Sequence, residues 1–258
     1  MRHERAALTR AEVLAQYRPI RAGIRRVLSE ATKACGRADL NRGIKQVAPW
    51  AETEALEEEV TAEMLVDVAL FEPNQRGRRA FDRFLAEKGK HLTGVDRALA
   101  ERMVGARFSI FRVAERHEAA GLWLEDLLAG QRRVWLVDEA LEVSASEDAV
   151  IGLRVFDAGP FHAGFGIIVA PDAETLDFCL AATERGEPLP FRHSLAATLY
   201  GDQLRASAPP GPADLALLEM LTDMLISSPA ALTMPGTKKA RRQPSSNPRN
   251  IPQPRKRR

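Results

Sequence analysis

The sequence predicts an α+β protein with helices at both ends, a small central antiparallel β barrel or curled sheet, and a disordered basic tail. Apolar residues recur at helical spacing on both sides of residues 107–170, whereas that stretch is a series of short β-branched and aromatic segments separated by turns. The last 22 residues combine nine Lys or Arg with four Pro and no acidic residue. These observations divide the chain into an N-terminal helical segment (1–60), an α+β domain (61–226) and a tail (227–258).

The first helix is expected over residues 9–34, where apolar positions lie three or four residues apart. Thr9 and Glu12 have the spacing of a capping box at its start. Pro19 lies inside the pattern, where proline removes a backbone donor and clashes with the preceding turn. We therefore expect a kink, or a break into two helices near Arg18.

Charge is segregated along the chain. Residues 1–47 hold 11 basic and 4 acidic residues, a net charge of +7, and residues 48–236 hold 17 basic and 31 acidic residues, a net charge of −14. The basic ends could therefore fold back on the acidic middle. Four arginines of the first helix lie off its apolar stripe, and a solvated polar face is the simplest interpretation of them. They are Arg18, Arg21, Arg25 and Arg26.

Shorter helices are expected before the β unit. One is predicted at 38–47, an apolar stretch at 64–71 ends before Pro73, and another helix spans about 94–104.

A loop at 74–79 carries three arginines and leads into a helix with a phenylalanine edge, Phe81 and Phe84. Planar guanidinium groups suit phosphate or carboxylate ligands. The alternative is an exposed loop whose arginines pair with the acidic residues of 52–63.

Strands and then helices follow. Strands are expected at 108–113, 121–128, 133–137, 143–145, 150–156 and 167–169. Glycines in the last of these strands indicate bulges or corners. Helices are expected again at 173–183, 194–200 and 212–226. Helices at both ends of a compact β unit are typical of an α+β fold.

The order of motifs from about residue 61 to 200 is similar to the region that precedes a SEC-C zinc motif in uncharacterised bacterial proteins. The segments that carry the resemblance are Phe71, 81–85, 107–113, 124–130, 142–146 and 150–156. The resemblance implies an α+β fold of bacterial type and no assigned activity. The SEC-C segment itself needs thiolate ligands for zinc. Residues 247–258 contain no Cys and no His, so we expect no metal site and no cofactor.

The composition indicates the cellular compartment of the protein. Cys35 and Cys179 lie far apart, which favours a reducing compartment over a disulfide framework. The sequence has no apolar leader segment at its start and no apolar run long enough to cross a membrane. A cytoplasmic protein without membrane contact is therefore the expectation.

A catalytic site is one of two hypotheses for function. His162 is expected in a flexible, aromatic-lined loop at 159–166, and His193 comes directly before a predicted helix. Together with Asp157 or Asp126 they could form the site of a hydrolase-like enzyme. Ser194 would be its nucleophile, but no GxSxG motif is present and Ser194 reads better as a helix cap.

The favoured hypothesis is a non-enzymatic binding or adaptor protein that acts through its tail. Nine cations could bind several phosphates of a nucleic acid, contact the ribosome, or bind an acidic protein, and the arginines of the first helix could assist. The alternative is a tail that only solubilises the chain. The nine candidate residues are Lys238, Lys239, Arg241, Arg242, Arg249, Arg255, Lys256, Arg257 and Arg258. The sequence leaves the oligomeric state open.

Overall fold

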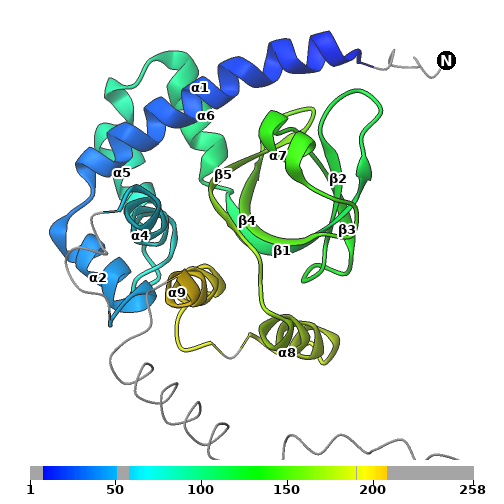
Figure 1. The fold of residues 1–258 in the computed structure, drawn as a ribbon. Helices are drawn as coiled ribbons and strands as arrows, with labels where there is room; N and C mark the ends of the chain where they lie inside the picture. The colour runs from blue at the N-terminus through cyan, green and yellow to red at the C-terminus, as the bar shows by residue number, and fades with distance from the viewer. Residues whose placement is uncertain (1–7, 51–57, 190, 208–258) are drawn as a thin grey trace, which may run out of the picture. The chain divides into compact units, whose positions relative to one another are not determined.

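The computed structural model describes residues 8–50, 58–189 and 191–207. The chain divides after residue 208, so all of these residues belong to its first unit. The predicted helix at 212–226 and the basic tail lie outside the described residues. A closed five-stranded β barrel with helices before and after it confirms the predicted fold class (Figure 1). No helix in the described ranges is both long enough and apolar enough to span a membrane.

Six helical elements of the described residues precede the barrel. They are α1 (Arg10–Ala34), α2 (Arg37–Val47), α4 (Glu59–Phe71), α5 (Ala80–Lys88), η1 (Gly89–His91) and α6 (Gly94–Met103). The capping box of Thr9 and Glu12 forms as predicted. The predicted break near Arg18 is wrong, because α1 continues through Pro19. Tyr17 and Ile24 are buried on either side of the proline, so tertiary packing holds the helix together across the missing hydrogen bond.

The barrel contains strands β1 (Arg107–Arg116), β2 (Leu122–Asp126), β3 (Arg132–Leu136), β4 (Val150–Asp157) and β5 (His162–Val169). Their order around the barrel is β1-β2-β3-β5-β4. The neighbours are antiparallel except for β3 and β5, which close the barrel with a parallel pairing of Leu136 and His162. This order, with a helix between β3 and β4, is that of the OB-fold, a five-stranded Greek-key barrel.

The predicted strand at 143–145 is wrong. Helix α7 (Glu139–Ser144) occupies this position, because the Asp138 side chain accepts hydrogen bonds from the backbone N–H groups of Ala140 and Leu141 and caps it. Leu141 of this helix packs among the inward side chains of the barrel. Helix α7 therefore contributes to the barrel core rather than to its wall.

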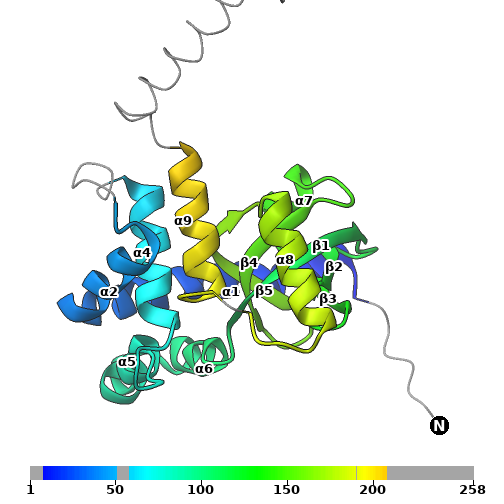
Figure 2. The same ribbon diagram turned by 90° about the horizontal axis from the view of Figure 1, so that it is seen from below.

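The helices pack mainly on one side of the barrel. Helices α8 (Ala173–Glu184) and α9 (Leu195–Ser207) follow β5, and α9 contacts α2, α4, β1, β4 and β5. Helices α4 and α1 pack on β5, and α6 packs on β4. Figure 2 shows α4 and α9 side by side next to the barrel. The N-terminal helices thus share their cores with the α+β part, and the predicted domain boundaries at 60 and 226 stay predictions.

The basic N-terminal helix folds back on acidic residues of the middle of the chain. Arg10 pairs with Glu142 (2.6 Å), Arg18 with Glu139 (2.9 Å) and Arg26 with Asp96 (2.6 Å). Arg21 Nη1 donates to the carbonyl oxygen of Gly164 (3.2 Å). The predicted solvated face is thus largely a set of half-exposed ion pairs that orient α1 on α6 and α7. Such pairs contribute little stability individually.

The first testable prediction concerns His117, which stacks on Trp135 with ring centroids 3.9 Å apart. Its Nδ1 accepts a hydrogen bond from Ala119 N (3.0 Å), which requires an unprotonated nitrogen. Burial lowers the pKa of His117. In the unfolded chain His117 has an ordinary pKa of about 6.5, whereas in the folded chain it binds a proton only at a lower pH. The free energy of unfolding should therefore fall as pH decreases through that window.

Urea unfolding at about pH 7 and about pH 5 measures the effect. The His117→Phe variant keeps an aromatic ring but cannot titrate, so it should lose less stability on acidification than the parent chain. Equal losses of stability in the two proteins would show that the pKa of His117 does not differ between the folded and unfolded states.

Candidate anion-binding sites

The three predicted catalytic residues do not all lie together. The predicted loop at His162 is wrong, because His162 begins β5 and pairs in register with Asp157 of β4, so these two are cross-strand neighbours. Burial lowers the pKa of His162. Asp157 is exposed, and its Oδ1 accepts from Gly159 N (2.8 Å). His193 lines a surface groove to which neither His162 nor Asp157 contributes.

Ser194 takes the role that its sequence context favours. Its hydroxyl oxygen accepts from Ala197 N (3.2 Å), as an N-cap of α9 does. No hydrogen bond between Ser194 and a histidine occurs within the described residues. The hydrolase hypothesis stays a prediction, with His162 and Asp157 as its adjacent members.

The groove that contains His193 is lined by four Lys or Arg residues and one carboxylate. It has a cavity volume of about 1060 Å³ and lies between α2, the loop after α4 and the start of α9. We call it the basic groove. Its cationic residues are Arg42, Lys45, Arg76 and Arg192, its amide side chains are Asn41, Gln46, Asn74 and Gln75, and its remaining members are Ala38, Glu72, Pro73, His193 and Ser194.

Local structure explains why these side chains meet. Gly43 allows α2 to cross α4 closely, since a Cβ at this position would lie 2.8 Å from the carbonyl oxygen of Leu65. The Asn74 side chain accepts from Arg76 N (2.9 Å) and Arg78 N (3.2 Å), which shapes the loop after α4. Arg76 is thereby presented at the mouth of the groove.

The electrostatics of the basic groove favour an anionic ligand. Lys45, Arg76 and Arg192 are exposed, and none forms an ion pair with another described residue. Glu72 is the one carboxylate among the lining residues, and its Oε1 accepts from Arg154 Nη2 (2.7 Å). Arg42 Nη2 donates to the carbonyl oxygen of Ala69 (2.9 Å), while its buried Nε has no hydrogen-bond partner among the described residues. The groove thus holds positive charge that its own walls do not neutralise.

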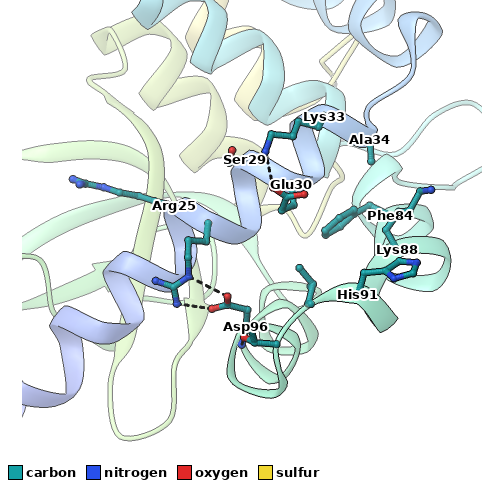
Figure 3. Close-up of a pocket in the computed structure, with 12 residues that line it drawn as sticks. Arg25, Ser29, Glu30, Lys33, Ala34, Phe84, Lys88, His91 and Asp96 are labelled. Carbon is teal, nitrogen blue, oxygen red and sulfur yellow. Dashed lines mark hydrogen bonds and ion pairs between the residues drawn. The ribbon is translucent and has the colours of Figure 1, made fainter.

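A second hollow lies between α1, α5 and η1, with a volume of about 670 Å³ (Figure 3). Lys33 of α1 pairs with Glu30, and Arg26 pairs with Asp96, so two of its cations are neutralised. Figure 3 shows Lys88 and His91 on the opposite wall from α1. This hollow is less cationic than the basic groove, and we regard it as secondary.

A third cavity, of about 620 Å³ between α1, α4 and β5, reaches the buried carboxylate of Asp67. Arg154 donates to both oxygens of Asp67 (2.8 and 2.9 Å), and the Tyr200 hydroxyl lies 3.2 Å from one of them. Burial raises the pKa of Asp67, and the Arg154 guanidinium opposes that shift. Because this carboxylate is already occupied by protein donors, we interpret the cluster as a structural network.

Sequence reasoning located only part of the basic groove. It singled out Arg76 for phosphate and His193 for catalysis, but it did not select Arg42, Lys45 or Arg192. Arg42 and Lys45 lie on α2 and Arg192 lies just before α9, and no spacing in the sequence links them to Arg76. The nine tail cations from Lys238 to Arg258 lie outside the described residues. No group of three potential metal ligands occurs in the parts of the chain that the structure describes.

The comparisons with known proteins give a family and no activity. Neither the curated proteins nor the solved structures contain a significant match to this chain. Nothing in the comparisons connects the chain to SEC-C motif proteins, so the sequence resemblance to that region gains no support. Residues 11–185, more than half of the chain, match the model described as "Family of unknown function (DUF7986)", and the chain belongs to that family.

Proposed function

We propose that this protein is a non-enzymatic binding protein for a phosphate-bearing polyanion, most simply a nucleic acid. The observation that supports this function best is the basic groove, where four cations and four amide side chains line one hollow. A guanidinium group can donate two parallel hydrogen bonds to the oxygens of one phosphate, and amide side chains add neutral donors. The tail, with nine cations in residues 237–258, would add sequence-independent affinity for the same partner.

The second testable prediction concerns the groove. The triple variant Lys45→Gln, Arg76→Gln, Arg192→Gln removes three exposed cations that form no ion pair with a described residue. Arg42 is left intact because it contacts the backbone of α4. Affinity of the full chain for a labelled oligonucleotide, measured by fluorescence anisotropy, should fall about tenfold or more near 50 mM salt.

A matched variant controls for net charge. Lys90→Gln, Arg97→Gln, Arg185→Gln removes the same charge from exposed positions outside the groove. It should change the affinity by less than about twofold and leave the salt dependence unaltered. Equal losses in the two triple variants would reject the groove as a binding site and leave only a general charge effect.

The tail is tested in the same assay. A full-length variant with all nine tail cations replaced by glutamine should bind more weakly and with a shallower dependence on salt. An unchanged affinity would remove the tail from the proposed function.

A further inference from the structure

The cavity between α1, α4 and β5 is a hollow that the proposed function does not use. Its volume of about 620 Å³ lies within the usual range for small-molecule sites, about 300–1,000 Å³. Such sites are mostly apolar and hold a few charged or polar groups that orient the ligand. We call this hollow the apolar cavity, and its apolar lining residues are Ile24, Leu28, Ala62, Val66, Leu70, Phe71 and Phe165. Leu28, Ala62 and Val66 are only partly buried, so apolar surface faces the hollow.

Besides the buried Asp67, four charged side chains line the apolar cavity. Arg21 and Arg25 lie one turn apart on α1. Glu59 and Glu63 lie one turn apart on α4. None of the four forms an ion pair with a described residue, so the nitrogen atoms of the arginine pair lie more than 4.0 Å from the oxygen atoms of the glutamate pair. Like charges one turn apart on a helix repel each other, and each pair therefore favours a ligand group of opposite charge.

The arginine pair begins beside strand β5. Arg21 Nη1 donates to the carbonyl oxygen of Gly164 (3.2 Å), which holds this side chain at the β5 edge of the cavity. Arg25 is exposed, and Figure 3 shows its side chain extending away from Asp96, the partner of Arg26. One guanidinium group is thus anchored by the backbone, and the other can turn toward a ligand.

Contacts between α4 and β5 give the apolar cavity a direction. A Cβ added to Gly166 would lie 3.4 Å from Asp67 Oδ1. One residue earlier in the strand, Phe165 packs on Phe71, which comes one turn after Asp67, with ring centroids 4.8 Å apart. From Gly166 back to Gly164, β5 therefore runs toward the C-terminal end of α4. The anchored arginine lies at that end of the cavity.

The glutamate pair lies toward the opposite end of α4. Glu63 and Glu59 precede Asp67 by about one and two helical turns, which is about 6 and 12 Å along the helix axis. The apolar cavity thus has a cationic end at β5 and an acidic end at the start of α4, with apolar side chains along its length. A ligand with a single charge would match only one of the two pairs.

A short free peptide has the chemistry that matches this arrangement. Its carboxylate can accept two parallel hydrogen bonds from a guanidinium group, and its ammonium group can pair with carboxylates. An extended chain advances by about 3.3–3.6 Å per residue, so two or three residues separate the two terminal charges by about 7–10 Å. A free amino acid carries both charges on one carbon and spans too little. The terminus of a folded protein offers only one of the two charges.

We propose that the apolar cavity binds a free peptide of two or three apolar residues. Its carboxylate pairs with Arg21 and Arg25, its ammonium group pairs with Glu59 and Glu63, and its side chains pack on the apolar lining. This proposal is independent of the proposed function, because none of these four residues lines the basic groove.

The third testable prediction uses calorimetric titration of the full chain with the tripeptide Leu-Ala-Leu. Binding should be saturable with one site per chain. Acetylation of the peptide amine or amidation of its carboxylate should each lower the affinity about fivefold or more, because each removes a charged partner. Free leucine should bind more weakly than the tripeptide. Absence of saturable binding, or equal affinity for a tripeptide capped at both ends, would overturn the proposal.

Substitutions assign each end of the peptide to its pair. Arg25→Gln should weaken binding of the free tripeptide about fivefold and have no further effect on the amidated one. Glu63→Gln should weaken binding of the free tripeptide and have no further effect on the acetylated one. Both side chains are exposed, whereas Arg21 is left intact because it contacts the backbone of β5. Equal losses for free and amidated tripeptide in Arg25→Gln would overturn the proposed pairing.

Matched variants control for charge. Lys90→Gln and Glu147→Gln change exposed residues outside the apolar cavity and should leave the affinity within about twofold of the parent. The triple variant of the basic groove should also bind the tripeptide normally, because none of its positions lines the apolar cavity. Loss of peptide affinity in that variant would place the peptide in the groove and overturn this site. A failure of nucleic-acid binding alone would reject the proposed function and leave the peptide site standing.

Discussion

Replacing Arg154 with methionine is expected to destabilise the folded protein by about 3–5 kcal/mol, the cost of leaving buried charge without its partner. The side chains of Arg154 and Asp67 are only 2% and 3% exposed. Burial alone would lower the pKa of Arg154, but the carboxylates of Asp67 and Glu72 more than reverse this effect and raise it. The guanidinium also lies over the rings of Phe71 and Phe108, at 5.1 and 5.6 Å. Urea unfolding followed by circular dichroism measures the loss.

A double variant provides the control for this fourth prediction. Arg154→Met combined with Asp67→Leu removes both members of the buried pair, and its stability should return to within about 1–2 kcal/mol of the parent, because apolar groups replace buried pairs at little cost. Glu72 stays, and its side chain is 13% exposed and so reaches water. A double variant no more stable than Arg154→Met would show that packing around the guanidinium, rather than uncompensated charge, causes the loss.

The Arg154→Met variant should also respond to acid in a defined direction. Without its partner, the buried Asp67 carboxyl has a pKa raised by burial, so the folded state binds a proton more tightly than the unfolded state. The difference in the free energy of unfolding between this variant and the parent should therefore shrink as pH is lowered toward about 3.9, the pKa of Asp in the unfolded chain. A deficit that stays constant with pH would contradict an ionised Asp67 in this variant.

Gly121→Ala should be comparably severe, with a loss of at least about 3 kcal/mol from strain and steric overlap together. Gly121 has φ of 81°, a conformation that disfavours a side chain. An added Cβ would also overlap the carbonyl oxygen of Leu136 and lie 2.9 Å from Val137 Cα. Both obstacles are backbone atoms at the end of β3, so they cannot rotate away. Thermal and urea unfolding of the variant test this fifth prediction.

Gly130→Ala is the matched control. Gly130 has φ of 63°, and an added Cβ would meet nothing within 4 Å. It should cost only about 1–2 kcal/mol, the price of the left-handed conformation alone. Similar losses for the two variants would show that the close approach to β3 relaxes easily and does not constrain the start of β2.

The fold could be predicted from the sequence wherever local pattern and tertiary packing agree. Helix α6 lies close to its expected position because its apolar residues recur at helical spacing, and β1 and β4 do so because they are rich in β-branched and aromatic residues. The prediction failed at Pro19, where packing overrides a helix breaker, and at 143–145, where a cap at Asp138 outweighs β propensity. Tertiary packing decided the first case, and a local capping residue decided the second.

The candidate sites were less accessible to sequence reasoning. Arg21 and Glu63 lie on α1 and α4, and only the packing of both helices on β5 places them at one cavity. Arg42, Arg76 and Arg192 come from segments more than 30 residues apart, and no periodicity links them. The positions of the arginines in the sequence therefore gave no indication of which ones would form ion pairs in the fold and which ones would line the basic groove.

By itself the sequence determined the fold class, the limits of most elements and the segregation of charge, since each depends on neighbours along the chain. Only the tertiary structure decided that α1 neutralises its arginines on α6 and α7, that Arg154 is buried against Asp67, and that cations of separate segments gather in the basic groove. The physical reason is that charge pairing and stacking depend on distances of a few ångströms, which for residues far apart in the chain are set by packing and strand register.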